Sequence, residues 1–131
     1  MNDAVIVAAR RTPTGKREGM LSGIHPADLS ALVIEDIVST TGIDPNLIDD
    51  VIWGCVTQAG EQTGDIARTA ALSAGLPESV TGVTVDRQCG SSQQALHFAA
   101  AGVASGQYDI AIAGGVESMS RNPMFSSSMG K

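Results

Sequence analysis

The alternation of apolar and polar positions along the chain predicts strands and helices that follow one another in turn. The run Ala4 to Ala9 is continuously apolar and of strand length, which is typical of a strand buried on both faces. Later short runs rich in β-branched residues predict further strands, and segments of helical spacing separate them. Strands are expected at 4–9, 51–57, 82–88 and 110–113, and helices at 26–41, 65–74 and 90–105.

Local signals fix the ends of these helices. Pro26 suits a first helical turn, where its missing N–H costs nothing, and Gly42, Gly75 and Gly106 are placed to end the three helices. Asp44 before Pro45 can cap a further short turn. The expected buried positions are Leu29, Leu32, Val33, Ile37 and Val38 on the first helix, and Ala95, Leu96, Ala99, Ala100 and Val103 on the last.

This order of elements predicts an α/β fold. Strictly alternating strands and helices are typical of a mostly parallel sheet with right-handed crossovers and with helices on both faces. A length of 131 residues is sufficient for one domain with a real core.

Composition narrows the possible functions. The content of 43% hydrophobic and 17% charged residues is that of an ordinary globular protein, and the net charge of −6 argues against a nucleic-acid surface. Arg10, Arg11, Lys16 and Arg17 are the local exception. They could contact the phosphates of a ligand such as coenzyme A, although such a cluster is more often a solvated or ion-paired face.

The two cysteines, Cys55 and Cys89, have neither metal-site spacing nor the arrangement of a disulfide framework. We therefore expect no metal and a cytoplasmic location. The run Ala4 to Ala9 is too short for a signal peptide or a membrane span, so we expect no targeting segment and no membrane contact.

Cys89 is the strongest candidate for chemistry. It lies where the third strand breaks and the last helix begins, so unpaired N–H groups and the positive end of the helix dipole favour its thiolate. The small residues Gly90, Ser91 and Ser92 would let a carbonyl approach the sulfur while the first-turn N–H groups hold an oxyanion. The carboxyl ends of strands are also where open α/β sheets bind ligands.

Gly114 and Gly115 follow the fourth predicted strand at the same end of the sheet. Two adjacent glycines allow another backbone or a substrate to come close, which is compatible with a tight turn that leaves the sheet.

Several segments together resemble the thiolase family, which includes acetyl-CoA acetyltransferases and 3-ketoacyl-CoA thiolases. The matching segments are Val5 to Pro13 with Gly15-Lys16, Gly54 to Gln58, Ala74 to Pro77, Val85 to Ser92 and Ala113 to Ser120. Two positions depart from the family pattern: Asp86 stands where thiolases more often have Asn, and Ser92 replaces a glycine, which could slightly narrow the approach to Cys89.

The resemblance implies the amino-terminal half of a thiolase, with Cys89 as the residue that carries the acyl group. It implies a domain over 1–120 and, over 121–131, the start of a lid region that we expect to be disordered. The closing strand, the rest of the lid and the second domain of the family would be absent. Coenzyme A thioesters are implied as substrates, with no other cofactor, and a homodimer is implied through this domain.

The bases that thiolase chemistry needs come from the family's carboxyl-terminal half, in motifs that this sequence lacks. His97 is eight residues after Cys89 on the same predicted helix and too far along it to reach the sulfur. His25, before Pro26, only imitates the family's Gly-His-Pro motif, and Cys55 is most simply a small buried hydrophobe. We therefore expect acylation of Cys89 but no turnover, unless a separate polypeptide supplies the missing half.

Two other functions stay open at this point. The chain could be a non-catalytic, thiolase-like dimerisation or partner-binding domain in which Cys89 is structural. It could also belong to a condensing enzyme of the ketoacyl-synthase kind, which shares the cysteine at a strand-to-helix turn, although 10–13 and 113–120 look more like a thiolase.

Overall fold

The computed structural model describes residues 3–129, and within them the chain forms a three-stranded parallel sheet. The strands are β1 (Asp50–Gly54), β2 (Thr81–Val85) and β3 (Ala111–Gly115). The order is β2-β1-β3, so β1 is central, and its Ile52 pairs with Val83 on one side and with Ala113 on the other. The predicted parallel sheet is confirmed.

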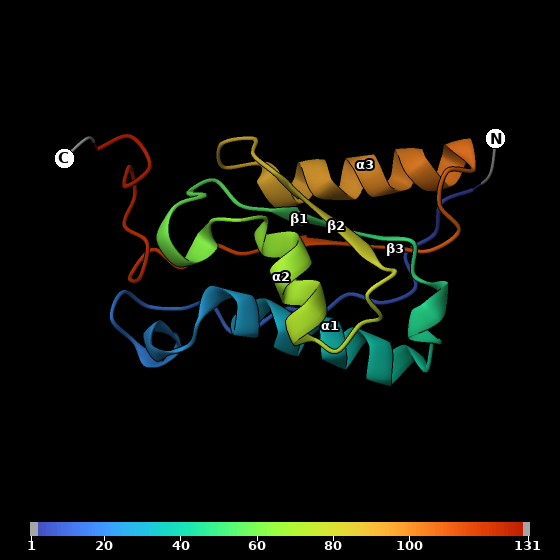
Figure 1. The fold of residues 1–131 in the computed structure, drawn as a ribbon, viewed down its shortest axis with the longest axis horizontal. Helices are drawn as coiled ribbons and strands as arrows, with labels where there is room; N and C mark the ends of the chain where they lie inside the picture. Colours follow the sequence, from blue (N-terminus) through green and yellow to red (C-terminus); the bar gives the residue numbers. More distant parts are fainter. Residues whose placement is uncertain (1–2, 130–131) are drawn as a thin grey trace.

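Within residues 3–129, three α-helices cover both faces of this sheet (Figure 1). They are α1 (Pro26–Thr41), α2 (Ile66–Ser73) and α3 (Ser91–Ser105). Short 3₁₀ helices, η1 (Met20–Gly23), η2 (Pro45–Leu47) and η3 (Gly60–Gln62), lie in the connections. In Figure 1, α3 lies on one side of the strands and α1 on the other, with α2 packed against α1. The predicted α/β class with helices on both faces is therefore confirmed.

The local signals place the helix ends as expected. Pro26 opens α1, and Gly42 and Gly106 end α1 and α3 in the left-handed conformation, at φ of 67° and 80°. Because glycine has no Cβ, it adopts this conformation without steric cost. Asp44 caps η2 by accepting a hydrogen bond of 3.0 Å from the N–H of Asn46, as predicted.

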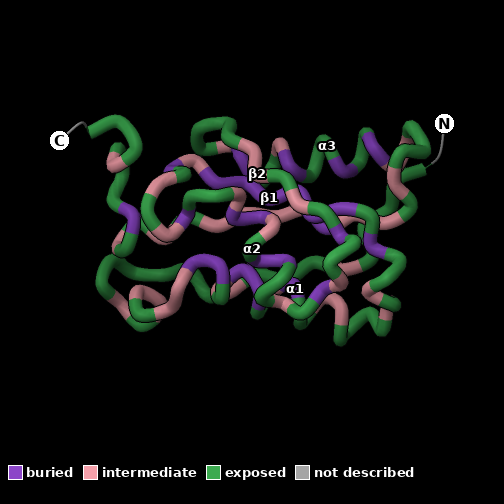
Figure 2. The backbone as a smooth tube through the Cα atoms, in the orientation of Figure 1, coloured by how far each residue is buried: buried purple, intermediate pink, exposed green. Residues whose placement is uncertain are grey.

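The central strand β1 divides the core into two clusters, because successive side chains of a strand point to opposite faces. Every residue of β1 is buried (Figure 2). Val51 and Trp53 join the larger cluster with α1 and α2, which includes Ile34 and Ile66. Ile52 faces the smaller cluster, which α3 forms with Ala95 and Ala99.

The predicted strand over Ala4 to Ala9 is wrong for the part of the chain that the structure describes. The run pairs with no strand there, and Val5, Ile6 and Val7 are 72–81% exposed. A strand needs a neighbour to satisfy its N–H and C=O groups, and no strand among the described residues lies beside the run. The run has the composition of a strand, but no partner strand within residues 3–129 buries it.

The helix faces also differ from the predictions. On α1 the buried residues are small ones and Ile34, and Leu32 is 53% exposed. On α3, Ala95 and Ala99 are buried as expected, but Leu96 and Ala100 are exposed. The buried face of α3 consists of small residues, Ser91, Ala95, Ala99 and Gly102, and at Gly102 a Cβ would lie 2.2 Å from the Tyr108 ring in the following loop.

The domain boundary at residue 120 and the disorder of 121–131 stay predictions, and residues 1–2 and 130–131 lie outside the described part of the chain. Residues 121–129 form a series of turns. None of the helices in residues 3–129 has both the length and the apolar character needed to cross a lipid bilayer.

Candidate active site

Cys89 lies in a short loop that joins β2 to α3. The strand ends at Val85, three residues earlier than predicted, and α3 begins at Ser91, so Cys89 precedes the helix by two residues. Its φ is +61°, a left-handed conformation that is uncommon for a residue with a Cβ, and its side chain is exposed. Strained backbone of this kind is concentrated at functional sites, where the surrounding structure holds it in place.

Arg87 and Ser91 close this turn. The N–H of Gly90 donates to the carbonyl of Arg87 at 2.6 Å. The Ser91 hydroxyl both accepts from the N–H of Arg87 and donates to its carbonyl, each at 3.1 Å. Sequence reasoning assigned Ser91 only a lack of bulk, whereas its side chain stabilises the bend that presents Cys89. A serine at a helix amino terminus is the signal that could have indicated this role.

Two glycines let α3 begin directly on the sheet. A Cβ on Gly54, at the end of β1, would lie 2.4 Å from the carbonyl carbon of Ser91. A Cβ on Gly115, at the end of β3, would lie 2.2 Å from the hydroxyl oxygen of Ser92. The absence of these two side chains therefore fixes how closely the turn of Cys89 approaches the carboxyl ends of the strands.

The prediction of close approach at Gly114 and Gly115 is confirmed, but both residues are the last of β3 and not part of a turn that leaves the sheet. Gly114 makes room for the Trp53 indole, since a Cβ there would lie 2.4 Å from a ring carbon. The Trp53 N–H donates in turn to the Ser30 hydroxyl of α1 at 3.1 Å. Gly114 and Gly115 thus allow close packing on opposite faces of the sheet, against Trp53 and against Ser92.

Cys89 opens into a cavity of about 710 Å³ at the carboxyl ends of the three strands. This volume is in the usual range for small-molecule sites. The lining comes from four segments: the end of β1 and its following loop, the loop before α3 with the first turn of α3, the end of β3, and the turns beyond it. We call this cavity the Cys89 pocket. Its lining residues lie within 54–57, 86–93, 115–119 and 124–128.

A hydrogen-bond network centred on Glu117 holds one side of the pocket. Its carboxylate accepts from the N–H of Val56 at 2.8 Å, from the N–H of Thr57 at 3.2 Å and from the Gln62 side-chain amide at 2.9 Å. Gln62 is fully buried, and its carbonyl oxygen accepts from the N–H of Ser118 at 2.6 Å. This network joins the loops after β1 and β3, and sequence reasoning missed it because its partners are 55 to 61 residues apart.

Cys55 is the second cysteine that lines the pocket, but its thiol is buried beneath the surface. Burial raises the pKa of the Cys55 thiol to about 12, and the negative charges of Glu117 and Asp86 act in the same direction. Its sulfur accepts from the Gln62 amide at 3.3 Å. Cys55 thus remains a protonated packing residue at neutral pH, in agreement with the prediction of a small buried hydrophobe.

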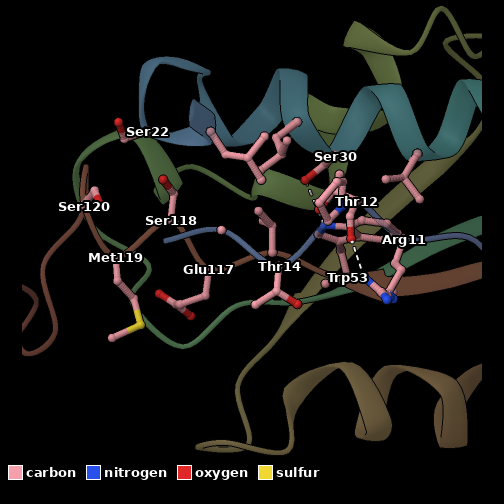
Figure 3. A pocket seen from close by; sticks show the side chains of 18 of the residues that line it. Arg11, Thr12, Thr14, Ser22, Ser30, Trp53, Glu117, Ser118, Met119 and Ser120 are labelled. Carbon is pink, nitrogen blue, oxygen red and sulfur yellow. Dashed lines mark hydrogen bonds between the residues drawn. The ribbon is translucent and has the colours of Figure 1, made fainter. Parts of the chain in front are cut away.

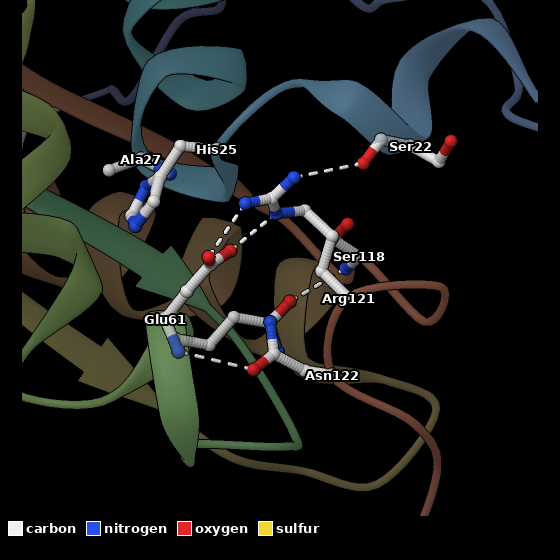
Figure 4. A network of polar contacts seen from close by, with 8 residues as sticks. Ser22, His25, Ala27, Glu61, Ser118, Arg121 and Asn122 are labelled. Carbon is white, nitrogen blue, oxygen red and sulfur yellow. Dashed lines mark hydrogen bonds and ion pairs between the residues drawn. The ribbon is translucent and has the colours of Figure 1, made fainter. Parts of the chain in front are cut away.

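The two histidines of the chain lie away from Cys89. His25 caps α1, since its Nδ1 accepts from the N–H of Ala27 at 3.1 Å. Figure 4 shows the His25 ring beside the ion pair of Glu61 and Arg121. His97 is exposed on α3. Among residues 3–129, neither histidine lines the Cys89 pocket.

The basic cluster lies at a second cavity of about 870 Å³, between residues 8–18, α1 and the end of β3 (Figure 3). Arg10 forms an ion pair with Asp36 at 2.7 Å, and the Arg11 guanidinium donates to the carbonyl of Thr12 at 3.0 Å. Lys16 and Arg17 are exposed. None of these four basic residues lines the Cys89 pocket in the part of the chain that the structure describes. The geometry therefore favours a solvated or ion-paired surface for them over contact with the phosphates of a ligand in that pocket.

Comparison with known proteins identifies relatives over nearly the whole chain. The family model for the amino-terminal domain of thiolases matches residues 4–130. A steroid 3-ketoacyl-CoA thiolase of Mycobacterium tuberculosis is 54% identical over 126 residues, which are 96% of this chain and 31% of that protein. A beta-ketoadipyl-CoA thiolase of Escherichia coli is 49% identical over 94% of this chain and 31% of its own length.

The fold gives the same result. The crystal structure of the Bacillus anthracis acetyl-CoA acetyltransferase superposes with a TM-score of 0.89 at 37% identity, over 100% of this chain and 34% of that one. The chain therefore spans about a third of the length of these relatives. On the motifs around Cys89, the parallel sheet and these matches, the chain belongs to the thiolase family and contains its amino-terminal domain.

Proposed function

We propose that the protein takes part in thiolase-type acyl transfer between coenzyme A thioesters, with Cys89 as the residue that accepts the acyl group. The observation that carries this proposal is the exposed, left-handed Cys89 at the start of α3, open to a cavity at the carboxyl ends of the strands. Cys89 is thus accessible to a substrate, whereas Cys55 is packed in the core.

In the proposed step the Cys89 sulfur attacks the carbonyl carbon of an acyl-CoA thioester. The new carbon–sulfur bond forms on Cys89, the bond to the coenzyme A sulfur breaks, and the thiol proton of Cys89 ends on the departing coenzyme A thiol. The first N–H groups of a helix have no intrahelical partner, so those of α3 can donate to the developing oxyanion.

We propose that the main base for these proton transfers lies beyond the described residues, although the Asp86 carboxylate also lines the pocket. Neither histidine in residues 3–129 lines the pocket, and the Glu117 carboxylate already accepts from two backbone N–H groups and from Gln62. The exposure of Val5 to Val7 also fits a domain that the remainder of a longer protein covers. We therefore propose that the chain can be acylated but does not turn over alone.

A homodimer is part of the same proposal. Strand β2 is an outer strand of the sheet, and its Val83 is 42% exposed. An open strand edge with an apolar residue favours pairing with another chain. A cytoplasmic location also fits, because Cys55 and Cys89 are both free thiols.

The decisive experiment is incubation with acetyl-CoA or acetoacetyl-CoA, followed by intact mass and peptide mapping. We expect one acetyl group on Cys89, none on a Cys89→Ala variant, and unchanged labelling of a Cys55→Ala variant. Steady thiolysis of acetoacetyl-CoA by these 131 residues would contradict the absence of turnover. A Cys89 that resists acyl-CoA and alkylating reagents alike would instead favour the non-catalytic dimerisation or partner-binding domain.

A further inference from the structure

One wall of the Cys89 pocket carries large apolar side chains, whereas the rest of its lining combines Val56 and Val116 with small and polar residues. Met119, Met124 and Phe125 form this wall, and all three follow β3 in the sequence. Their exposed fractions are 51%, 53% and 64%. We call these three residues the apolar wall.

Polar contacts hold the segment that carries the apolar wall. Before Met119, the N–H of Ser118 donates to the buried Gln62 side chain at 2.6 Å. Between Met119 and Met124, the Arg121 guanidinium pairs with the Glu61 carboxylate, and the Asn122 side-chain oxygen accepts from the N–H of Glu61 at 3.2 Å (Figure 4). These contacts hold the segment beside the pocket that contains Cys89, and the carbonyl of Phe125 closes a local turn by accepting from the N–H groups of Ser128 and Met129.

Three large apolar side chains that stay half-exposed beside a nucleophile are unfavourable in water, and an apolar ligand that covers them is favoured. An acetyl group has a single methyl and can cover only a small part of them. The pocket volume of about 710 Å³ leaves room for a longer chain. Since the acyl group would be attached to Cys89 in the same pocket, its chain is the occupant that the position of the wall indicates.

We propose that Met119, Met124 and Phe125 form an acyl-chain subsite, which favours acyl groups with an apolar chain longer than acetyl. This proposal rests on the proposed role of Cys89 as acyl acceptor. It makes the apolar wall the part of this chain that sets acyl preference, whereas Cys89 and its turn supply the reaction common to all acyl groups.

Alkylation of Cys89 tests the subsite without the missing bases. The Cys89 thiol loses its proton to the buffer, its sulfur attacks the methylene carbon of iodoacetamide or of N-hexyliodoacetamide, a carbon–sulfur bond forms and iodide leaves. We define the ratio as the rate with N-hexyliodoacetamide divided by the rate with iodoacetamide. Its value for glutathione gives the intrinsic preference of a thiol. We expect the ratio on Cys89 to be about tenfold higher than on glutathione, because burial of about two methylenes on the wall is sufficient for that factor.

Single variants of the wall, Met124→Ser, Phe125→Ser and Met119→Ser, should lower the ratio towards that of glutathione. Met20→Ser is the matched control, since Met20 is 98% exposed and lies outside the lining of the pocket. It should keep the ratio of the unsubstituted protein. Far-UV circular dichroism verifies that each variant retains the fold, and peptide mapping verifies that Cys89 is the labelled residue.

A glutathione-like ratio in the unsubstituted protein would overturn the subsite alone and leave Cys89 as acyl acceptor. So would wall variants that keep the high ratio, because the preference would then not come from the side chains of the wall. Failure of Cys89 to react with either reagent would overturn the proposed function, and the subsite with it.

Discussion

At the scale of single residues, the backbone of Cys89 is the feature on which the candidate site depends. A residue with a Cβ at φ of +61° is less favourable than a glycine there by about 1–2 kcal/mol. The contacts of Arg87 with Gly90 and Ser91 hold the turn against this cost. The sulfur is therefore presented by a conformation that the chain would not adopt in isolation.

This strain predicts an unusual order of stability among variants at position 89. Cys89→Gly should be more stable to urea than Cys89→Ala by about 1 kcal/mol, because glycine adopts the left-handed conformation without the Cβ contact. At an ordinary position of negative φ, the alanine variant would be the more stable. An alanine variant as stable as the glycine variant would show that Cys89 does not hold this conformation in solution.

Cys55 gives a prediction on pH. Burial raises the pKa of its thiol from the ordinary 9.0 to about 12, so ionisation is easier in the unfolded chain than in the folded one. The contribution of Cys55 to stability is complete below about pH 9 and is lost as pH rises towards about 12. The difference in free energy of unfolding between the unsubstituted protein and Cys55→Ala should therefore shrink across this range, as measured by urea unfolding at each pH. A difference independent of pH would contradict the burial of this thiol.

At the scale of elements, the site depends on how closely α3 approaches the sheet. Gly54 of β1 and Gly115 of β3 leave the space in which the first turn of α3 lies. The same close packing selects small residues on the inner face of α3 and leaves Leu96 outside. The close approach of α3 to the ends of β1 and β3 thus positions both the inner face of the helix and the turn that carries Cys89.

A methyl group at position 54 should displace α3. In Gly54→Ala the new Cβ would meet the Ser91 backbone at 2.4 Å, and backbone atoms can relax only if the helix moves. We expect a loss of about 3 kcal/mol in urea unfolding and slower alkylation of Cys89. Gly23→Ala is the matched control, because a Cβ there meets nothing within 4 Å, and it should change stability by less than about 0.5 kcal/mol. Equal stability of the two variants would be inconsistent with this packing.

At the scale of the whole molecule, several apolar surfaces lack a neighbour within residues 3–129. Val5 to Val7 are exposed, and Leu29, Val33 and Ile37 of α1 are only half-buried beside the second cavity. The sheet is also open at both outer strands, β2 and β3. These surfaces agree with a domain that functions in contact with other protein surfaces, as the proposed homodimer and a longer chain both require.

The outer edge of β2 gives a test of the homodimer. Lysine at an exposed edge position opposes strand pairing, so Val83→Lys should convert a dimer of the 131-residue chain to a monomer in sedimentation velocity. Leu47→Lys, at a residue 57% exposed in η2, should remain dimeric. A monomeric unsubstituted protein, or a Val83→Lys variant that stays dimeric, would contradict pairing through β2.

The sequence by itself determined those features that depend on local chemistry. Pro26, Gly42 and Gly106 set helix ends through their own backbone preferences, and the segments around Cys89 and Gly115 identified the family. Such signals act within one turn of chain or within one motif, so they can be recognised without knowledge of the fold.

The tertiary structure alone decided what depends on distant partners. Ala4 to Ala9 has the composition of a strand, but no strand of residues 3–129 pairs with it, and pairing requires hydrogen bonds from another segment. Gly54 and Gly115 let the turn of Cys89 approach the ends of the strands, and the loops at the pocket are joined by Glu117 and Gln62 across more than 50 residues. Contacts between segments so far apart leave no periodic pattern in the sequence, so only the folded chain shows them.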